Sequence, residues 1–146
     1  MGGYIAFEFL RRRPERIRAL VLVNTRTPAD SREAVSGRHE MADRVKREGT
    51  HVVADQMAQK SFSAEAADEL RVGWRELMAI TPPMGVATAL RAMARRPDSS
   101  ETLRTIDRPV LIIAGEEDRL IPIVDAHQMH ELAPTFRLES SRVRAT

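Results

Sequence analysis

Two short apolar runs lie far apart in the chain, and each has the composition of a buried β-strand. Residues 18–24 read RALVLVN and residues 110–114 read VLIIA, with none of the polar alternation of a half-exposed strand. Continuous runs of this kind are typical of parallel strands covered on both faces. The chain is therefore expected to have an α/β architecture, in which helices connect parallel strands.

Helical patterns occupy most of the chain around these runs. Residues 4–13 carry apolar side chains at helical spacing and are followed by a proline that stops the helix. Residues 31–96 contain four further helical segments, separated by glycine and proline. After the second run, residues 124–134 predict a helix and residues 135–139 predict the start of a third strand.

The order of these elements predicts a division of the chain. We expect residues 1–30 and 97–146 to form a partial α/β core. The segment 31–96 is expected to be a helical insertion between the first two strands, because its helices interrupt the strand–helix alternation.

Composition limits the classes of partner. Of 146 residues, 42% are hydrophobic and 30% are charged, which is typical of a folded globular chain. The net charge is only +2, and 21 Arg against 2 Lys are mixed with acidic residues along the chain, so we predict no nucleic-acid partner. The chain has no Cys and no apolar stretch long enough to span a membrane. No secretory leader is expected, because no charged segment followed by an apolar one marks the start of the sequence. A cytoplasmic protein without a membrane partner is expected.

Two blocks of this sequence resemble the α/β-hydrolase family. Met1, Gly2 and Gly3, with the helix and strand that follow to residue 25, are similar to the region just after the nucleophile, where the family's G-x-S-x-G turn often ends Ser-Met-Gly-Gly. Residues 108–122, RPVLIIAGEEDRLIP, are similar to the strand and loop that carry the acid of the catalytic triad. The resemblance covers about residues 1–138. It implies a partial α/β-hydrolase fold, with parallel strands flanked by helices and an inserted helical cap.

The resemblance assigns two site residues. Asp118 matches the triad acid, which would orient a histidine imidazole and stabilise its charged form; Glu116 and Glu117 beside it are not favoured. Met1 matches the residue after the nucleophile, whose backbone N–H would donate to the oxyanion in a complete chain. As a free terminus its nitrogen is an ammonium, so we expect that role to be compromised. Gly2 and Gly3 are interpreted as a flexible terminus without a role.

The other two triad members are missing from the expected positions. The nucleophilic serine would precede Met1, and none of the eight serines present stands in a G-x-S-x-G motif. The family places its histidine after the third strand, whereas the chain after about Leu138 contains neither His nor Gly. We therefore expect a truncated family member that is inactive as it stands, because triad residues act as a unit.

Other side chains leave alternatives open. His127 and His130 lie three residues apart on one predicted helix. They could be a pair of metal ligands, but the favoured interpretation is that both are exposed on the helix surface. Trp74 and Met78 lie four apart in the insertion and serve helix packing or line a substrate pocket. His39 and His51, also in the insertion, are further candidates for lining it. No metal or cofactor is expected.

The functional prediction is a hydrolase of esters or lactones, with enol-lactonase-like members as the suggested relatives and a small-molecule ester or lactone as substrate. Two alternatives remain: a non-enzymatic helical interaction module built on residues 31–96, and one complementing half of a split hydrolase. The apolar strand at 19–24 is expected to expose an unpaired edge, which favours self-association.

Overall fold

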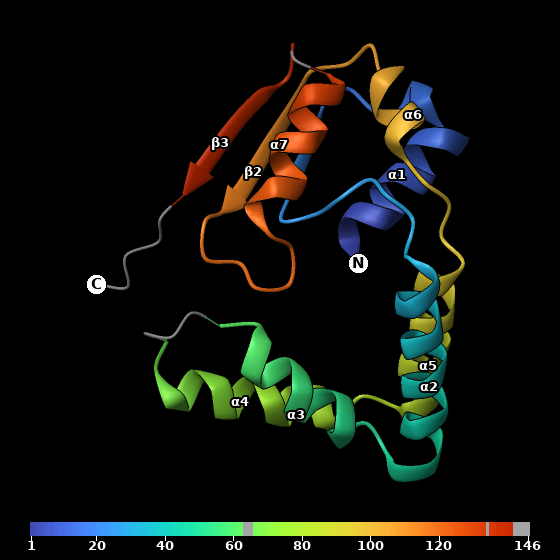
Figure 1. The fold of residues 1–146 in the computed structure, drawn as a ribbon, viewed down its shortest axis with the longest axis vertical. Helices are drawn as coiled ribbons and strands as arrows, with labels where there is room; N and C mark the ends of the chain where they lie inside the picture. The colour runs from blue at the N-terminus through green and yellow to red at the C-terminus, as the bar shows by residue number, and fades with distance from the viewer. Residues whose placement is uncertain (63–65, 134, 142–146) are drawn as a thin grey trace. The chain divides into compact units, whose positions relative to one another are not determined.

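The computed structural model separates into two compact units. The first unit contains all three described strands with their helices, and the second is helical (Figure 1). The residues described are 1–62, 66–133 and 135–141, of which 1–29 and 97–141 belong to the first unit and 30–96 to the second.

Three parallel strands form the sheet of the first unit. They are β1 (Leu20–Val23), β2 (Val110–Gly115) and β3 (Arg137–Ser141), and they lie in the order β1–β2–β3. Leu22 is in register with Ile112 at the centre of the β1–β2 pair. Parallel neighbours need crossover connections, and helices supply them here. The predicted α/β class is confirmed.

The helices of the first unit begin with α1 (Gly2–Arg12), followed by the 3-10 helix η1 (Pro14–Arg16). Pro14 excludes its predecessor from helical geometry, so α1 ends before it. Helix α6 (Ser100–Arg104) precedes β2, and α7 (Ile123–Leu132) connects β2 to β3 and packs on both strands.

The amino end of α1 corrects one expectation. The helix starts at Gly2 rather than at residue 4, because the Met1 carbonyl accepts hydrogen bonds from the Tyr4 N–H (3.0 Å) and the Ile5 N–H (3.3 Å). The interpretation of Gly2 and Gly3 as a flexible terminus is therefore wrong. Both residues are helical.

One face of the sheet carries the core of the first unit. Leu22 and Ile112 point into it from β1 and β2, and the helices supply Phe7, Leu103 and Met129, all fully buried. Burial of such side chains contributes about 1.5–3 kcal/mol each, so this core is the main source of stability in the unit.

The opposite face and the outer edge of β1 are open among the described residues. Val21 and Val23 point away from the core and are 55% and 56% exposed. On the sheet, β1 pairs with β2 alone of the described strands, so the hydrogen-bonding groups along its other edge lack a strand partner.

Four helices form the described part of the second unit. These are α2 (Arg32–Glu48), α3 (His51–Lys60), α4 (Asp68–Ala79) and α5 (Pro83–Ala94), with α2 packed along α5 and α3 along α4. Through the described ranges, no helix of the chain is both long and apolar enough to cross a bilayer.

Local signals explain where α2 begins and ends. The Ser31 hydroxyl caps its first turn by accepting from the Ala34 N–H at 3.2 Å. Gly49 ends it with a positive φ of 99°, a conformation that a side chain rarely adopts. The next residue, Thr50, is buried, and its hydroxyl donates to the Thr81 carbonyl at 2.7 Å, which joins the α2–α3 turn to the α4–α5 turn.

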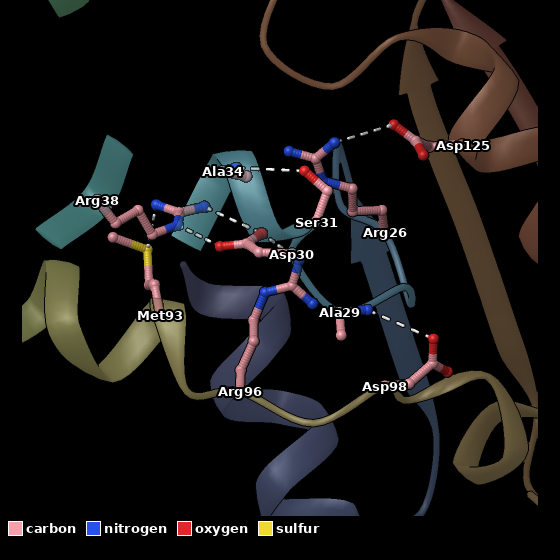
Figure 2. A network of polar contacts seen from close by, with 10 residues as sticks. All are labelled: Arg26, Ala29, Asp30, Ser31, Ala34, Arg38, Met93, Arg96, Asp98 and Asp125. Atoms are coloured by element: carbon pink, nitrogen blue, oxygen red, sulfur yellow. Dashed lines mark hydrogen bonds and ion pairs between the residues drawn. The ribbon is translucent and has the colours of Figure 1, made fainter. Parts of the chain in front are cut away.

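A buried carboxylate joins the two ends of the second unit. Asp30, its first residue, accepts hydrogen bonds from Arg38 on α2 and from Arg96, its last residue, the latter at 2.9 Å (Figure 2). The Asp30 side chain is 3% exposed and that of Arg96 is 8% exposed. Burial by itself would raise the pKa of Asp30, but the Arg38 hydrogen bond and the two guanidinium charges lower it overall.

Candidate active site

The loop that follows β2 holds one carboxylate against the backbone. Asp118 Oδ1 accepts from the N–H groups of Leu120 (2.7 Å) and Ile121 (2.9 Å). The Asp118 N–H donates to the carbonyl of Gly115, the last residue of β2, at 3.3 Å. These three hydrogen bonds tie the side chain to the loop and the loop to the end of the strand.

The second oxygen of Asp118 is available. Within the described ranges Oδ2 has no hydrogen-bond or ion-pair partner, and the residue is only partly exposed. A carboxylate with one oxygen fixed by amides and the other open is suited to accept a hydrogen bond from another group, such as an imidazole N–H.

The two neighbouring glutamates are placed differently. Glu116 and Glu117 are exposed. The Glu116 carboxylate accepts from the Ser140 hydroxyl on β3 at 3.2 Å. Among the contacts of the described residues, the carboxylate of Asp118 is the one that accepts from backbone amides of the loop, and this favours it over its neighbours on geometric grounds.

The amino end of α1 reaches the same end of the sheet. A β carbon on Gly3 would lie 2.2 Å from Thr25 Oγ1, so helix and strand end touch there. Thr25 follows Asn24, whose side chain bonds to Gly115 at the start of the acid loop. The start of α1 and the acid loop therefore both adjoin the carboxyl end of β1. In open α/β sheets ligands bind outside these strand ends.

Sequence reasoning missed Asn24. It is the first residue after β1, has a positive φ of 44°, and its Oδ1 accepts from the Gly115 N–H at 2.8 Å. Asn is among the few residues that adopt this conformation readily, so an Asn directly after an apolar run was the available signal.

Met1 and the histidines are placed as follows. Met1 is the N-cap residue of α1 and is 64% exposed. On α7, His127 is exposed and His130 is half-buried; in the second unit, His39 is half-buried and His51 is exposed. No group of three or more potential metal ligands is found in the part of the chain that the structure describes.

Met78 and Trp74, the other two candidates of the second unit, differ in their surroundings. Met78 packs against the cluster of Val45, Val52 and Val53, which is a packing role. Trp74 makes an edge-to-face contact with Phe62, with ring centroids 6.0 Å apart, and stays 43% exposed.

Together, these features define an α/β protein with a candidate site at the carboxyl ends of parallel strands, where the start of α1 and the acid loop both adjoin the end of β1. The chain belongs to the alpha/beta hydrolase fold family, whose sequence profile matches residues 1–143. The family prediction made from the sequence is confirmed.

Several relatives are similar over nearly the whole chain. An esterase from Thermogutta terrifontis, solved with malate bound, is 33% identical with a TM-score of 0.90, over 96% of this chain and 53% of its own. The enol-lactonase from Burkholderia xenovorans LB400 has the same fold at 23% identity and a TM-score of 0.83, over 97% and 54%. A Bacillus subtilis (strain 168) protein with the provisional name 2-succinyl-6-hydroxy-2,4-cyclohexadiene-1-carboxylate synthase is 28% identical over 148 residues, 95% of this chain and 54% of its own. The chain thus spans about half the length of these relatives.

Proposed function

We propose that this chain carries the acid of a Ser–His–Asp site that cleaves esters or lactones, and that Asp118 is that acid. The observation that supports the proposal is the placement of its carboxylate: Oδ1 accepts from Leu120 and Ile121, and Oδ2 is open. An acid in this position would hold an imidazole in one tautomer and stabilise the imidazolium that forms when a serine is deprotonated. This chemistry uses no metal or organic cofactor.

The nucleophile and the base are not supplied by these 146 residues. None of the serines lies in a G-x-S-x-G motif, and none of the four histidines follows β3. We therefore propose that the chain alone forms no acyl-enzyme, and that it acts as the acid-bearing half of a complete site. In such a site the nitrogen of Met1, within a peptide bond, would be the oxyanion donor.

The second unit is proposed to be the cap of that site. It is inserted in the chain between β1 and β2, and Trp74 and Met84 on it are 43% and 61% exposed. An ester or lactone is the proposed substrate class, because the relatives named as an esterase and an enol-lactonase share this fold. The cytoplasmic location and the self-association remain predictions.

A burst assay tests the activity of the chain itself. The purified 146-residue protein is mixed with a chromogenic ester, and release of the chromophore is followed against buffer. We expect no stoichiometric burst, because triad members act as a unit. A burst of one equivalent per chain would overturn the proposed inactivity.

A chimera tests Asp118 directly. Residues 1–141 replace the corresponding segment of the Thermogutta terrifontis esterase, which supplies the remainder of the domain. Asp118→Asn should then lower kcat by about 10⁴-fold, as expected when the imidazole loses its orienting carboxylate. The matched control Glu117→Gln should leave kcat unchanged. The assignment is contradicted if Glu117→Gln abolishes the activity of the chimera and Asp118→Asn leaves it intact.

A further inference from the structure

The backbone changes direction at Asn24 while its hydrogen bonding to β2 continues. The Asn24 N–H donates to the Ile113 carbonyl at 3.0 Å, as the next rung of the parallel β1–β2 ladder. In a regular parallel ladder, the carbonyl of the same residue would accept from the amide two positions further along the partner strand, which is Gly115.

The side chain of Asn24 takes the place of that carbonyl. Its φ of 44° turns the following peptide out of the strand direction. The Gly115 N–H instead donates to Asn24 Oδ1 at 2.8 Å. One more rung is thereby added to the ladder after β1 has ended.

This rung lies directly before the acid loop. The Gly115 N–H is held by Asn24, and the Gly115 carbonyl accepts from the Asp118 N–H at 3.3 Å. On the other side, the Glu116 N–H donates to the Ser141 carbonyl of β3 at 3.2 Å. The first residues of the loop are therefore held from both neighbouring strands, and the β1 side depends on a single side chain.

The space around Gly115 agrees with this arrangement. A β carbon on Gly115 would lie 3.6 Å from Asn24 Nδ2 and 3.9 Å from the Asp118 β carbon. Asn24 and Asp118 thus flank the same residue, one bonded to its N–H and the other to its carbonyl.

We propose that Asn24 is a positioning residue for Asp118, acting through Gly115. The inference rests on the proposed role of Asp118 as the triad acid. Asn suits the position because it combines a tolerated positive φ with a side-chain acceptor. Gly would keep the backbone conformation and lose the acceptor, whereas Asp would keep both.

Amide hydrogen exchange of the full chain, read residue by residue by NMR, tests the proposal. In Asn24→Gly, protection of the Gly115, Leu120 and Ile121 amides should fall by about tenfold, as expected for loss of one hydrogen bond. The Ile112 amide, inside β2, should keep its protection. Asn24→Asp should restore protection at the first three amides, because the acceptor is retained.

Three outcomes would overturn the proposal. Unchanged exchange at Leu120 and Ile121 in Asn24→Gly would show that Asp118 is placed independently of Asn24. An equal loss at Ile112 would show a general loss of stability, and failure of Asn24→Asp to rescue would exclude the acceptor as the cause. None of these readings uses catalysis, so they are independent of the Asp118→Asn chimera that tests the proposed function.

Discussion

Thr25 lies so close to Gly3 that a β carbon on residue 3 would be 2.2 Å from its Oγ1 and 2.6 Å from its β carbon. Thr25 is 5% exposed, so its side chain cannot move into solvent without opening the core. Only glycine at position 3 lets α1 pack this closely against the end of β1. The contact places the amino end of α1 at the carboxyl end of β1. The acid loop begins beside this strand end.

Gly3→Ala should destabilise the first unit. The added methyl group overlaps the Thr25 side chain, and such overpacking costs about 1–3 kcal/mol. Urea unfolding followed by circular dichroism measures the loss. Gly2→Ala is the matched control, because its added β carbon would have no atom within 4 Å apart from its chain neighbours and the backbone of its own helix. Equal stability of the two variants would contradict the predicted overlap.

Asp30→Asn should destabilise the second unit. The change removes the Asp30 negative charge from its ion pair with the Arg96 guanidinium, which is 8% exposed. Removing one member of a buried ion pair costs about 3–5 kcal/mol. Exchange protection of the α2 and α5 amides reports the effect. Asp43→Asn is the control, because Asp43 is 52% exposed in its pair with Arg91 and such pairs contribute about 0–1 kcal/mol.

The same carboxylate should make stability depend on pH. The pKa of Asp30 is lowered from its ordinary value of 3.8. A lowered pKa in the folded state contributes stability above pH 3.8, and this contribution is lost as the pH falls through the folded-state value. Unfolding free energies of the wild type and of Asp30→Asn should therefore converge as the pH is lowered below that range. A constant difference between the two across this range would exclude Asp30 as the titrating group.

The open side of β1 should drive self-association. Val21 and Val23 are 55% and 56% exposed beside a strand edge with no described strand partner. Sedimentation velocity should show oligomers that increase with concentration, and Val21→Lys with Val23→Lys should shift the chain toward monomer. Val72→Lys, on α4 and 52% exposed, should leave the distribution unchanged. A monodisperse wild-type monomer would contradict the prediction.

The elements of the fold were largely predictable from the sequence. The apolar run in residues 18–24 contains β1, the run at 110–114 lies within β2, and the segment 135–139 overlaps β3. The predicted helix ends were less accurate. The sequence predicted that the first helix starts at residue 4, because glycine has a low helix propensity and the local pattern does not offset it, whereas α1 begins at Gly2. Contacts of the helix with the rest of the first unit provide that compensation.

The candidate site was predictable only in part. Asp118 was singled out by resemblance, since three acids in succession differ little as a pattern. The hydrogen bonds from Leu120 and Ile121, which distinguish it from Glu116 and Glu117, are visible only in the folded loop.

Local order along the chain therefore determined the class, the family and the succession of strands and helices, because apolar periodicity and turn residues act between near neighbours. Tertiary structure alone decided the need for glycine at position 3 and the bond from Gly115 to Asn24, a residue 91 positions away. Contacts over such separations depend on how the strands are placed side by side, and no local pattern encodes that placement.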